Sequence, residues 1–228
     1  MQRDSTRLPG YRQAAWFTRQ RITRMQNAGN DSLIRASLAR LRRGIGKEPG
    51  SLPELWGETL EGLPADLAGQ SGHPSTGEWA VYIALTLFAL HQQGKDIKKE
   101  CMHQEGQRLG LALRKLIHDV EEEQRIKRRF DQVVTADSPQ EVSHYLRTLV
   151  QLLRAGDVPL DYGSLARDLC LMQIPDARDG VRLQWGRDFY CVTFTEDLDE
   201  TQDVDQENTE GEENHEENSR ENNEFAHD

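Results

Sequence analysis

The sequence has little cysteine and no long apolar run. Its three cysteines, Cys101, Cys170 and Cys191, are odd in number and widely spaced, so we expect no disulfide framework and a reducing, cytoplasmic setting. The most apolar run, residues 79–90, is about twelve residues long, whereas a membrane-spanning helix needs about 20. No apolar segment follows the positively charged N-terminal residues, so we predict neither a signal peptide nor a membrane partner.

Motifs typical of enzymes are also missing. The sequence contains no Walker loop, no GxGxxG, no GxSxG and no HExxH. His91, Cys101, His103 and Cys170 are conceivable metal ligands, but their spacing matches no zinc pattern. We therefore predict a protein without catalytic residues, metal or cofactor.

The charge is unevenly distributed along the chain. The net charge of −11, from 28 Lys and Arg against 39 Asp and Glu, describes an acidic protein and a poor candidate for nucleic-acid binding. Residues 195–228, however, hold 15 acidic residues and one Arg, a net −14. Residues 1–194 hold 27 basic and 24 acidic residues, a net +3. The chain is thus a mildly basic body followed by an acidic tail.

Apolar residues nearly vanish after Phe194. Such a segment buries too little surface to offset the entropy of ordering, so we predict that 195–228 is a disordered acidic C-terminal tail. It is either a solubilising extension or a competitor that keeps nucleic acid off a basic surface until assembly.

Helical periodicity dominates the body, and strand alternation is weak throughout. Apolar stripes at i, i+4, i+7 begin at Ile34, Leu109, Ile126 and Val142, and residues 79–90 are apolar nearly all round, as in a central buried helix. Ser138 followed by Pro139 predicts a helix start, Asp161 predicts the cap of a helix reaching about Met172, and Gly44 predicts a stop. We predict an all-α fold, a compact helical bundle in two subdomains, 1–118 and 119–194.

A first basic cluster lies on the helix expected around residues 32–43. Residues 1–47 contain eleven basic residues and two acidic ones, and Arg35, Arg42 and Arg43 share a helix face at i, i+7, i+8. This spacing can hold consecutive phosphates. The alternative is that basic residues late in a helix only favour its macrodipole and solubility.

A second basic cluster consists of Arg125, Arg128 and Arg129, at i, i+3, i+4, with Lys127 between them. Because Ile126 and Phe130 point inward, these arginines are expected to cover the outer face of their helix. The alternative to nucleic-acid binding is an ion pair on the helix surface between Arg125 and Glu121.

A third basic cluster, Arg108, Arg114 and Lys115, lies beside Gly106 and Gly110. Glycines at i, i+4 let another backbone come close, whether a packed helix or a nucleic acid. With the other two clusters, this one makes nucleic-acid contact a serious hypothesis.

The order of several elements resembles one family. These are LARLRRG around Arg42 and Arg43, ALTLFALHQQG (84–94), GQRLGLALRKL (106–116), RIKRRFDQVVTAD (125–137), YLRTLVQLLRAGDVPLDYGSLARDL (145–169) and QWGRDFY (184–190). Over roughly residues 10–194 the sequence resembles the CasB family, the small subunit of the type I-E CRISPR surveillance complex called Cascade.

The resemblance implies an all-helical, two-part fold without catalytic activity. It implies two copies head to tail against the backbone subunits that carry the guide RNA, near the large subunit. It further implies basic surfaces that hold the displaced DNA strand and stabilise the R-loop formed by guide RNA and target DNA in antiviral defence. The positions carried over are Arg42, Arg43, Arg108, Arg114, Lys115, Arg128 and Arg129, with Arg147 and Arg154 as possible additions.

Two other functions fit parts of the pattern. A helical interaction scaffold would direct its arginines to acidic protein surfaces instead of nucleic acid. The acidic tail suggests a histone-chaperone-like protein, but the arginine-rich N-terminal region argues against it. Salt-dependent DNA binding separates the scaffold from the nucleic-acid-binding subunit.

Overall fold

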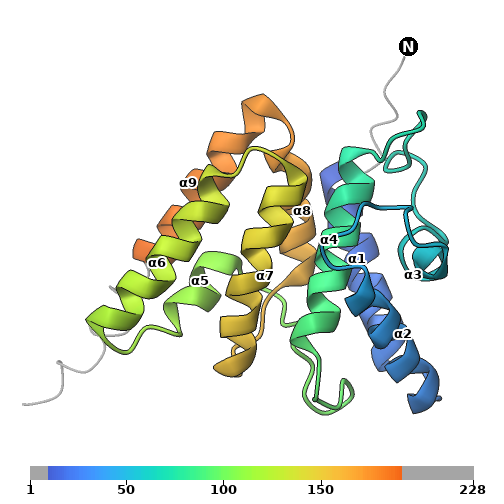
Figure 1. Ribbon diagram of the computed structural model, residues 1–228, viewed down its shortest axis with the longest axis horizontal. Coiled ribbons are helices and arrows are strands. Elements are labelled where there is room, and N and C mark those ends of the chain that lie inside the picture. Colours follow the sequence, from blue (N-terminus) through green and yellow to red (C-terminus); the bar gives the residue numbers. More distant parts are fainter. Residues whose placement is uncertain (1–9, 192–228) are drawn as a thin grey trace, which may run out of the picture. The chain divides into compact units, whose positions relative to one another are not determined.

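The computed structural model describes residues 10–191. Within them lie nine α-helices and one 3₁₀ helix (Figure 1): α1 Gly10–Gln26, α2 Asp31–Arg43, η1 Pro53–Leu55, α3 Trp56–Thr59, α4 Thr76–His91, α5 Leu109–Arg114, α6 Val120–Thr135, α7 Pro139–Ala155, α8 Tyr162–Met172 and α9 Pro175–Tyr190. The described part holds no strand, only an isolated bridge between His103 and Leu160. The all-α prediction is confirmed.

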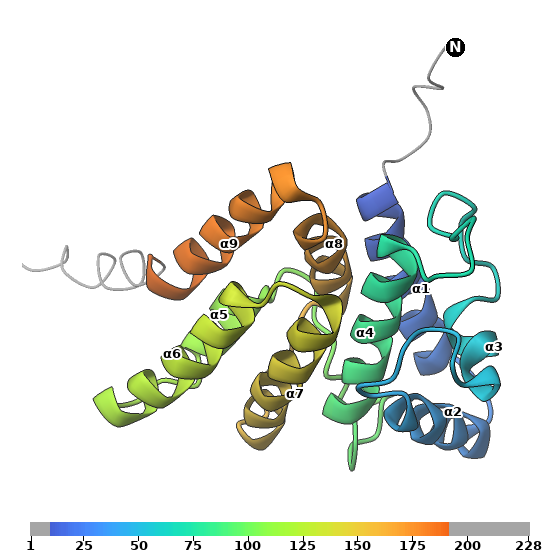
Figure 2. The same ribbon diagram turned by 45° about the horizontal axis from the view of Figure 1, so that its top comes forward.

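Helix α4 is the central element. Almost every residue of it is buried, and it packs against α1, α2, α7 and α8 (Figures 1 and 2). A capping box begins it: Ser75 Oγ accepts a hydrogen bond from Glu78 N at 3.0 Å, and Glu78 Oε2 accepts one from Ser75 N at 2.7 Å. The predicted central buried helix is therefore confirmed.

Helix α8 joins the two groups of helices on either side of it. It packs against α1 and α4 on one side and against α9 on the other (Figure 2). The helix begins at the predicted cap, since Asp161 Oδ1 accepts a hydrogen bond from Ser164 N at 2.9 Å. Its first residue, Tyr162, is fully buried and meets Phe88 of α4 edge to face at 5.3 Å between ring centroids.

Local signals located several helix ends correctly. Helix α7 begins at Pro139 with Ser138 as its cap, and α2 ends before Gly44. Gly44 has an ordinary helical φ of −76°, so its role is close packing: a Cβ atom there would lie 2.7 Å from Tyr82 Oη. Helix α5 is shorter than its leucine stripe predicts and ends at Arg114, after which tighter i→i−3 hydrogen bonds close the last turn.

The expected boundary between residues 118 and 119 falls just before α6. Contacts cross it in both directions: α5 packs against α7 and α9, and α8 packs against α1 and α4. The division into two subdomains stays a prediction, and the predicted tail 195–228 lies outside the described residues. None of the helices described is long and apolar enough to cross a membrane.

Candidate nucleic-acid interface

The predicted cluster on α2 borders a groove. Arg35 and Arg42 line one wall, and the loop of residues 92–97 after α4 lines the other, enclosing about 460 Å³. We call this the α2 groove. The apolar stripe of α2, including Ile34 and Leu38, is buried, which turns the two arginines toward the loop.

A second helix brings another guanidinium to this region. Arg42 is half-buried, and its Nη1 donates to Ala89 O at 3.4 Å. Burial lowers the pKa of Arg42, and the nearby Arg154 of α7 lowers it further. Arg154 is held at the loop, because its Nε donates to Gln93 O at 3.1 Å. Two like charges that approach each other in this way favour a bound anion.

The carboxylates near the α2 groove have partners of their own. Asp31 and Asp96 line the groove and pair with Lys98 at 2.7 Å and with Lys99 at 3.9 Å. Asp157 nearby pairs with Lys95 at 2.6 Å. The hydrogen bond from its lysine lowers the pKa of Asp31 and of Asp157. Across the described residues Arg35, Arg42 and Arg154 form no ion pair, although Arg35 lies near enough to Asp31 to lower the pKa of that carboxyl as well.

The remaining arginines predicted on α2 and α7 do not line the groove. Arg43 is exposed at the end of α2, and Arg147 is exposed on α7. The family resemblance gave Arg147 and Arg154 of α7 as possible additions. Of these two, it is Arg154 that approaches α2.

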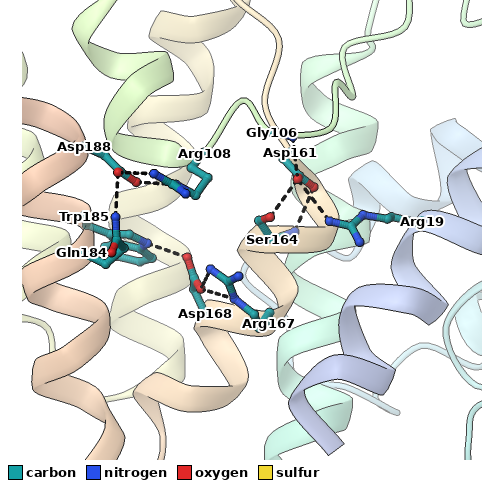
Figure 3. A network of polar contacts seen from close by, with 10 residues as sticks. All are labelled: Arg19, Gly106, Arg108, Asp161, Ser164, Arg167, Asp168, Gln184, Trp185 and Asp188. Carbon is teal, nitrogen blue, oxygen red and sulfur yellow. Dashed lines mark hydrogen bonds and ion pairs between the residues drawn. The ribbon is translucent and has the colours of Figure 1, made fainter. Parts of the chain in front are cut away.

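The cluster around α5 is partly engaged within the protein. Arg108 donates from Nε to Asp188 Oδ2 at 2.7 Å and from Nη2 to Oδ1 at 2.5 Å (Figure 3), and this contact raises the pKa of Arg108. Lys115 Nζ donates to Gln107 Oε1 at 2.8 Å. Arg114 is half-buried and has no ion pair in the described part. Binding of nucleic acid by this cluster stays a prediction.

Gly110 in α5 and Gly106 in the turn before it have separate explanations. A Cβ atom at Gly110 would lie 2.6 Å from Asp188 Cβ and 2.5 Å from Trp185 O, so Gly110 lets α5 pack directly on α9. Gly106 has a φ of +81°, in the left-handed region that glycine adopts freely. Helix packing and turn geometry thus account for both.

The cluster on α6 is exposed apart from the half-buried Arg129, and part of it is paired. Arg125 contacts Glu122 at 3.6 Å, so the expected surface ion pair exists with a neighbour of Glu121. Arg129 Nη1 donates to Arg125 O at 3.1 Å, while Arg128 is exposed and has no ion pair among the residues described. Helix α6 packs on α7, and α2 packs on α4, well apart in Figure 1. The clusters on α2 and α6 therefore belong to different parts of the surface.

Two arginines that buried carboxylates hold were not singled out from the sequence; one is held by a distant residue and one by its chain neighbour. Arg19 Nη2 donates to Asp161 Oδ2 at 3.2 Å, across 142 residues. Arg167 Nε donates to Asp168 Oδ1 at 2.8 Å, and Trp185 Nε1 donates to the other oxygen of that carboxylate at 2.7 Å (Figure 3). Asp161 was identified only as a helix cap, and no local signal showed that it also holds an arginine.

The conceivable metal ligands have other contacts. His91 Nδ1 lies 2.9 Å from Tyr162 Oη, and His103 Nδ1 lies 3.3 Å from Leu160 O. Among the described residues, no group of three or more His, Cys, Asp or Glu side chains is suited to hold a metal ion.

Comparisons with known proteins identify the family. The family model for CRISPR-associated protein Cse2 matches residues 37–190. The crystal structure of CasB from Thermobifida fusca shares 36% sequence identity with a TM-score of 0.65, covering 78% of this chain and 97% of that chain. The crystal structure of M. ruber CasB, at 21% identity and a TM-score of 0.56, covers 76% of this chain and 92% of that chain and supports the fold. A comparison with curated proteins gives no match. The chain therefore belongs to the CRISPR-associated Cse2 (CasB) family.

Proposed function

We propose that the chain is a non-catalytic small subunit of a Cascade complex in CRISPR defence, and that its α2 groove binds nucleic-acid backbone and stabilises the displaced DNA strand of the R-loop. Family membership supports the role as a Cascade subunit. The groove carries the rest of the proposal, because Arg35 and Arg42 line it, Arg154 approaches Arg42, and none of the three forms an ion pair in the described part.

The chemistry of the groove suits a phosphate backbone. A guanidinium is planar, always charged, and donates two parallel hydrogen bonds to phosphate oxygens. Backbone contacts position a strand without reading its sequence. That property fits a displaced strand whose sequence changes with every target.

The proposed partners follow from this role. They are the backbone and large subunits of the complex, a second copy of the chain, and the R-loop of guide RNA and target DNA. The exposed arginines of α6, led by Arg128, and the residues Arg43 and Arg114 are further candidates for these contacts.

Salt dependence of DNA binding tests the proposal. The full chain is titrated with a fluorescein-labelled single-stranded oligonucleotide at several salt concentrations, and log K is plotted against log salt. Each phosphate contact on a single strand contributes about 0.7 to the slope, so the double variant Arg35→Gln/Arg42→Gln should lower its magnitude by about 1.4. The control Arg182→Gln/Arg187→Gln removes two charges from α9 and should leave the slope unchanged.

Two results would contradict the proposal. An unchanged slope in the α2 double variant, with its circular dichroism spectrum intact, would show that the groove does not contact phosphate. Absent binding by the unmodified chain, together with normal incorporation into the complex, would favour the interaction scaffold whose arginines face acidic protein surfaces.

A further inference from the structure

A second groove lies between α1 and α8 and shares no lining residue with the α2 groove. It encloses about 560 Å³. Arg12, Trp16, Arg19 and Thr23 line it from α1, at i, i+4, i+7, i+11 on one helix face, and Arg167 faces them from α8. We call it the Trp16 groove.

The aromatic ring in this groove is partly exposed. Trp16 is 49% exposed, as is Trp56, whereas Trp79 and Trp185 are buried in the core. An indole buries a large apolar area when it packs, so leaving half of it in water gives up stabilisation. Arginines line the same groove, where a flat, negatively charged ligand would find both a stacking surface and cations.

Two of these arginines are fixed from behind by buried carboxylates (Figure 3). Arg19 contacts Asp161, whose side chain is 1% exposed, and Arg167 contacts Asp168, whose side chain is 5% exposed. The arginine side chains themselves remain 34% and 36% exposed. Arg19 contacts its carboxylate through Nη2, and Arg167 through Nε and Nη2. Holding the guanidinium in place lowers the entropy lost when a ligand binds.

The chain also makes room for this arrangement. A Cβ atom at Gly163 would lie 2.6 Å from Arg19 Cγ, so glycine allows the stem of Arg19 to lie directly on α8. Glu105 is the one carboxylate of the lining; it is 72% exposed and lies 3.5 Å from Arg19 Nε. An exposed carboxylate of this kind is well screened by solvent.

We infer that the Trp16 groove binds single-stranded nucleic acid by stacking one base on Trp16 while Arg12, Arg19 and Arg167 hold the neighbouring phosphates. The inference rests on the proposed nucleic-acid-binding function and adds a base-contacting site to it. Stacking requires an unpaired base and tolerates any sequence. The Trp16 groove therefore distinguishes a displaced strand from duplex DNA. The phosphate contacts of the α2 groove do not make this distinction.

Two oligonucleotides separate stacking from phosphate binding. The full chain is titrated with fluorescein-labelled oligothymidylate and with an abasic oligonucleotide of equal length, which keeps the phosphates and lacks the bases. Trp16→Leu should weaken oligothymidylate binding by about 5- to 150-fold, the range measured for removing one base–aromatic stack, and should leave abasic binding unchanged. Trp16→Phe should retain most of the affinity. Trp56→Leu is the matched control, since Trp56 is also 49% exposed.

The outcomes are distinguishable. The stacking inference is overturned if Trp16→Leu weakens binding of both oligonucleotides equally or of neither. In that case, salt-dependent binding of the abasic oligonucleotide by the unmodified chain still supports the proposed function. If Trp16→Leu instead prevents incorporation into the complex and keeps oligothymidylate affinity, the groove is a protein interface and the inference fails. If the unmodified chain binds neither oligonucleotide, the proposed function fails as well.

Discussion

Acid should destabilise the fold through one buried histidine. His91, the last residue of α4, is fully buried, and its Nδ1 lies 2.9 Å from Tyr162 Oη. Burial lowers the pKa of His91 from 6.5 to about 4, and the nearby charges of Lys95 and Arg154 act in the same direction. The imidazole is therefore neutral in the folded chain well below the pH at which it becomes charged in the unfolded chain.

The sign of the pH dependence follows from the two pKa values. Because the folded-state pKa lies below the unfolded-state value, the unfolded chain binds a proton between pH 6.5 and pH 4 that the folded chain does not. The contribution to stability is fully present above pH 6.5 and is lost as the pH falls toward 4. At about 1.36 kcal/mol per pKa unit, the full loss is about 3 kcal/mol, most of which has occurred by pH ~4.5.

Comparison with His91→Gln isolates this residue. Glutamine keeps a polar group facing Tyr162 Oη and does not titrate. Urea unfolding is followed by circular dichroism at pH ~7 and at pH ~4.5. The free energy of unfolding of the variant should fall by about 2–3 kcal/mol less than that of the unmodified chain. His103, whose pKa burial also lowers, is present in both proteins and cancels in the difference. Equal losses in the two proteins would refute a buried neutral His91.

Three further changes have defined outcomes. Gly110→Ala places a Cβ atom 2.5 Å from Trp185 O, so we expect a loss of about 1–3 kcal/mol in unfolding free energy; an unchanged urea midpoint would contradict the close packing of α5 on α9. Asp161→Ala removes the acceptor of hydrogen bonds from Arg19, Gly106 N and Ser164. The free energy of unfolding should fall by about 3 kcal/mol; stability within error of the unmodified chain would show that these bonds contribute nothing. Deleting 195–228 removes a net charge of −14 and should raise the affinity for single-stranded DNA at low salt; equal affinity would exclude competition by the tail and leave a solubilising extension.

Helix positions were predictable because their signals are local. The caps Ser138 and Asp161 act within three residues of themselves, and the apolar character of residues 79–90 directly indicates burial. The end of α5 was less predictable, because a leucine stripe continues through a tightened last turn just as it does through a full helix.

The binding surface was only partly predictable because it depends on contacts between distant residues. Sequence spacing placed Arg35 and Arg42 on one helix face, and the structure sets both in the α2 groove. Spacing could not show that Arg154 approaches Arg42 from another helix, or that Asp188 engages Arg108 across 80 residues. Which arginines remain available is decided by tertiary packing, which a helical pattern does not encode.

The lifetime of the R-loop tests the central claim most directly. Complexes are assembled with guide RNA and either the unmodified chain or Arg35→Gln/Arg42→Gln, and equal incorporation of the subunit is verified. The displaced strand is then followed by the permanganate reactivity of its unpaired thymines after competitor DNA is added. We expect the double variant to lose this reactivity faster than the unmodified complex, and faster still at higher salt. Equal R-loop lifetimes in the two complexes would contradict the assignment of the α2 groove to the displaced strand.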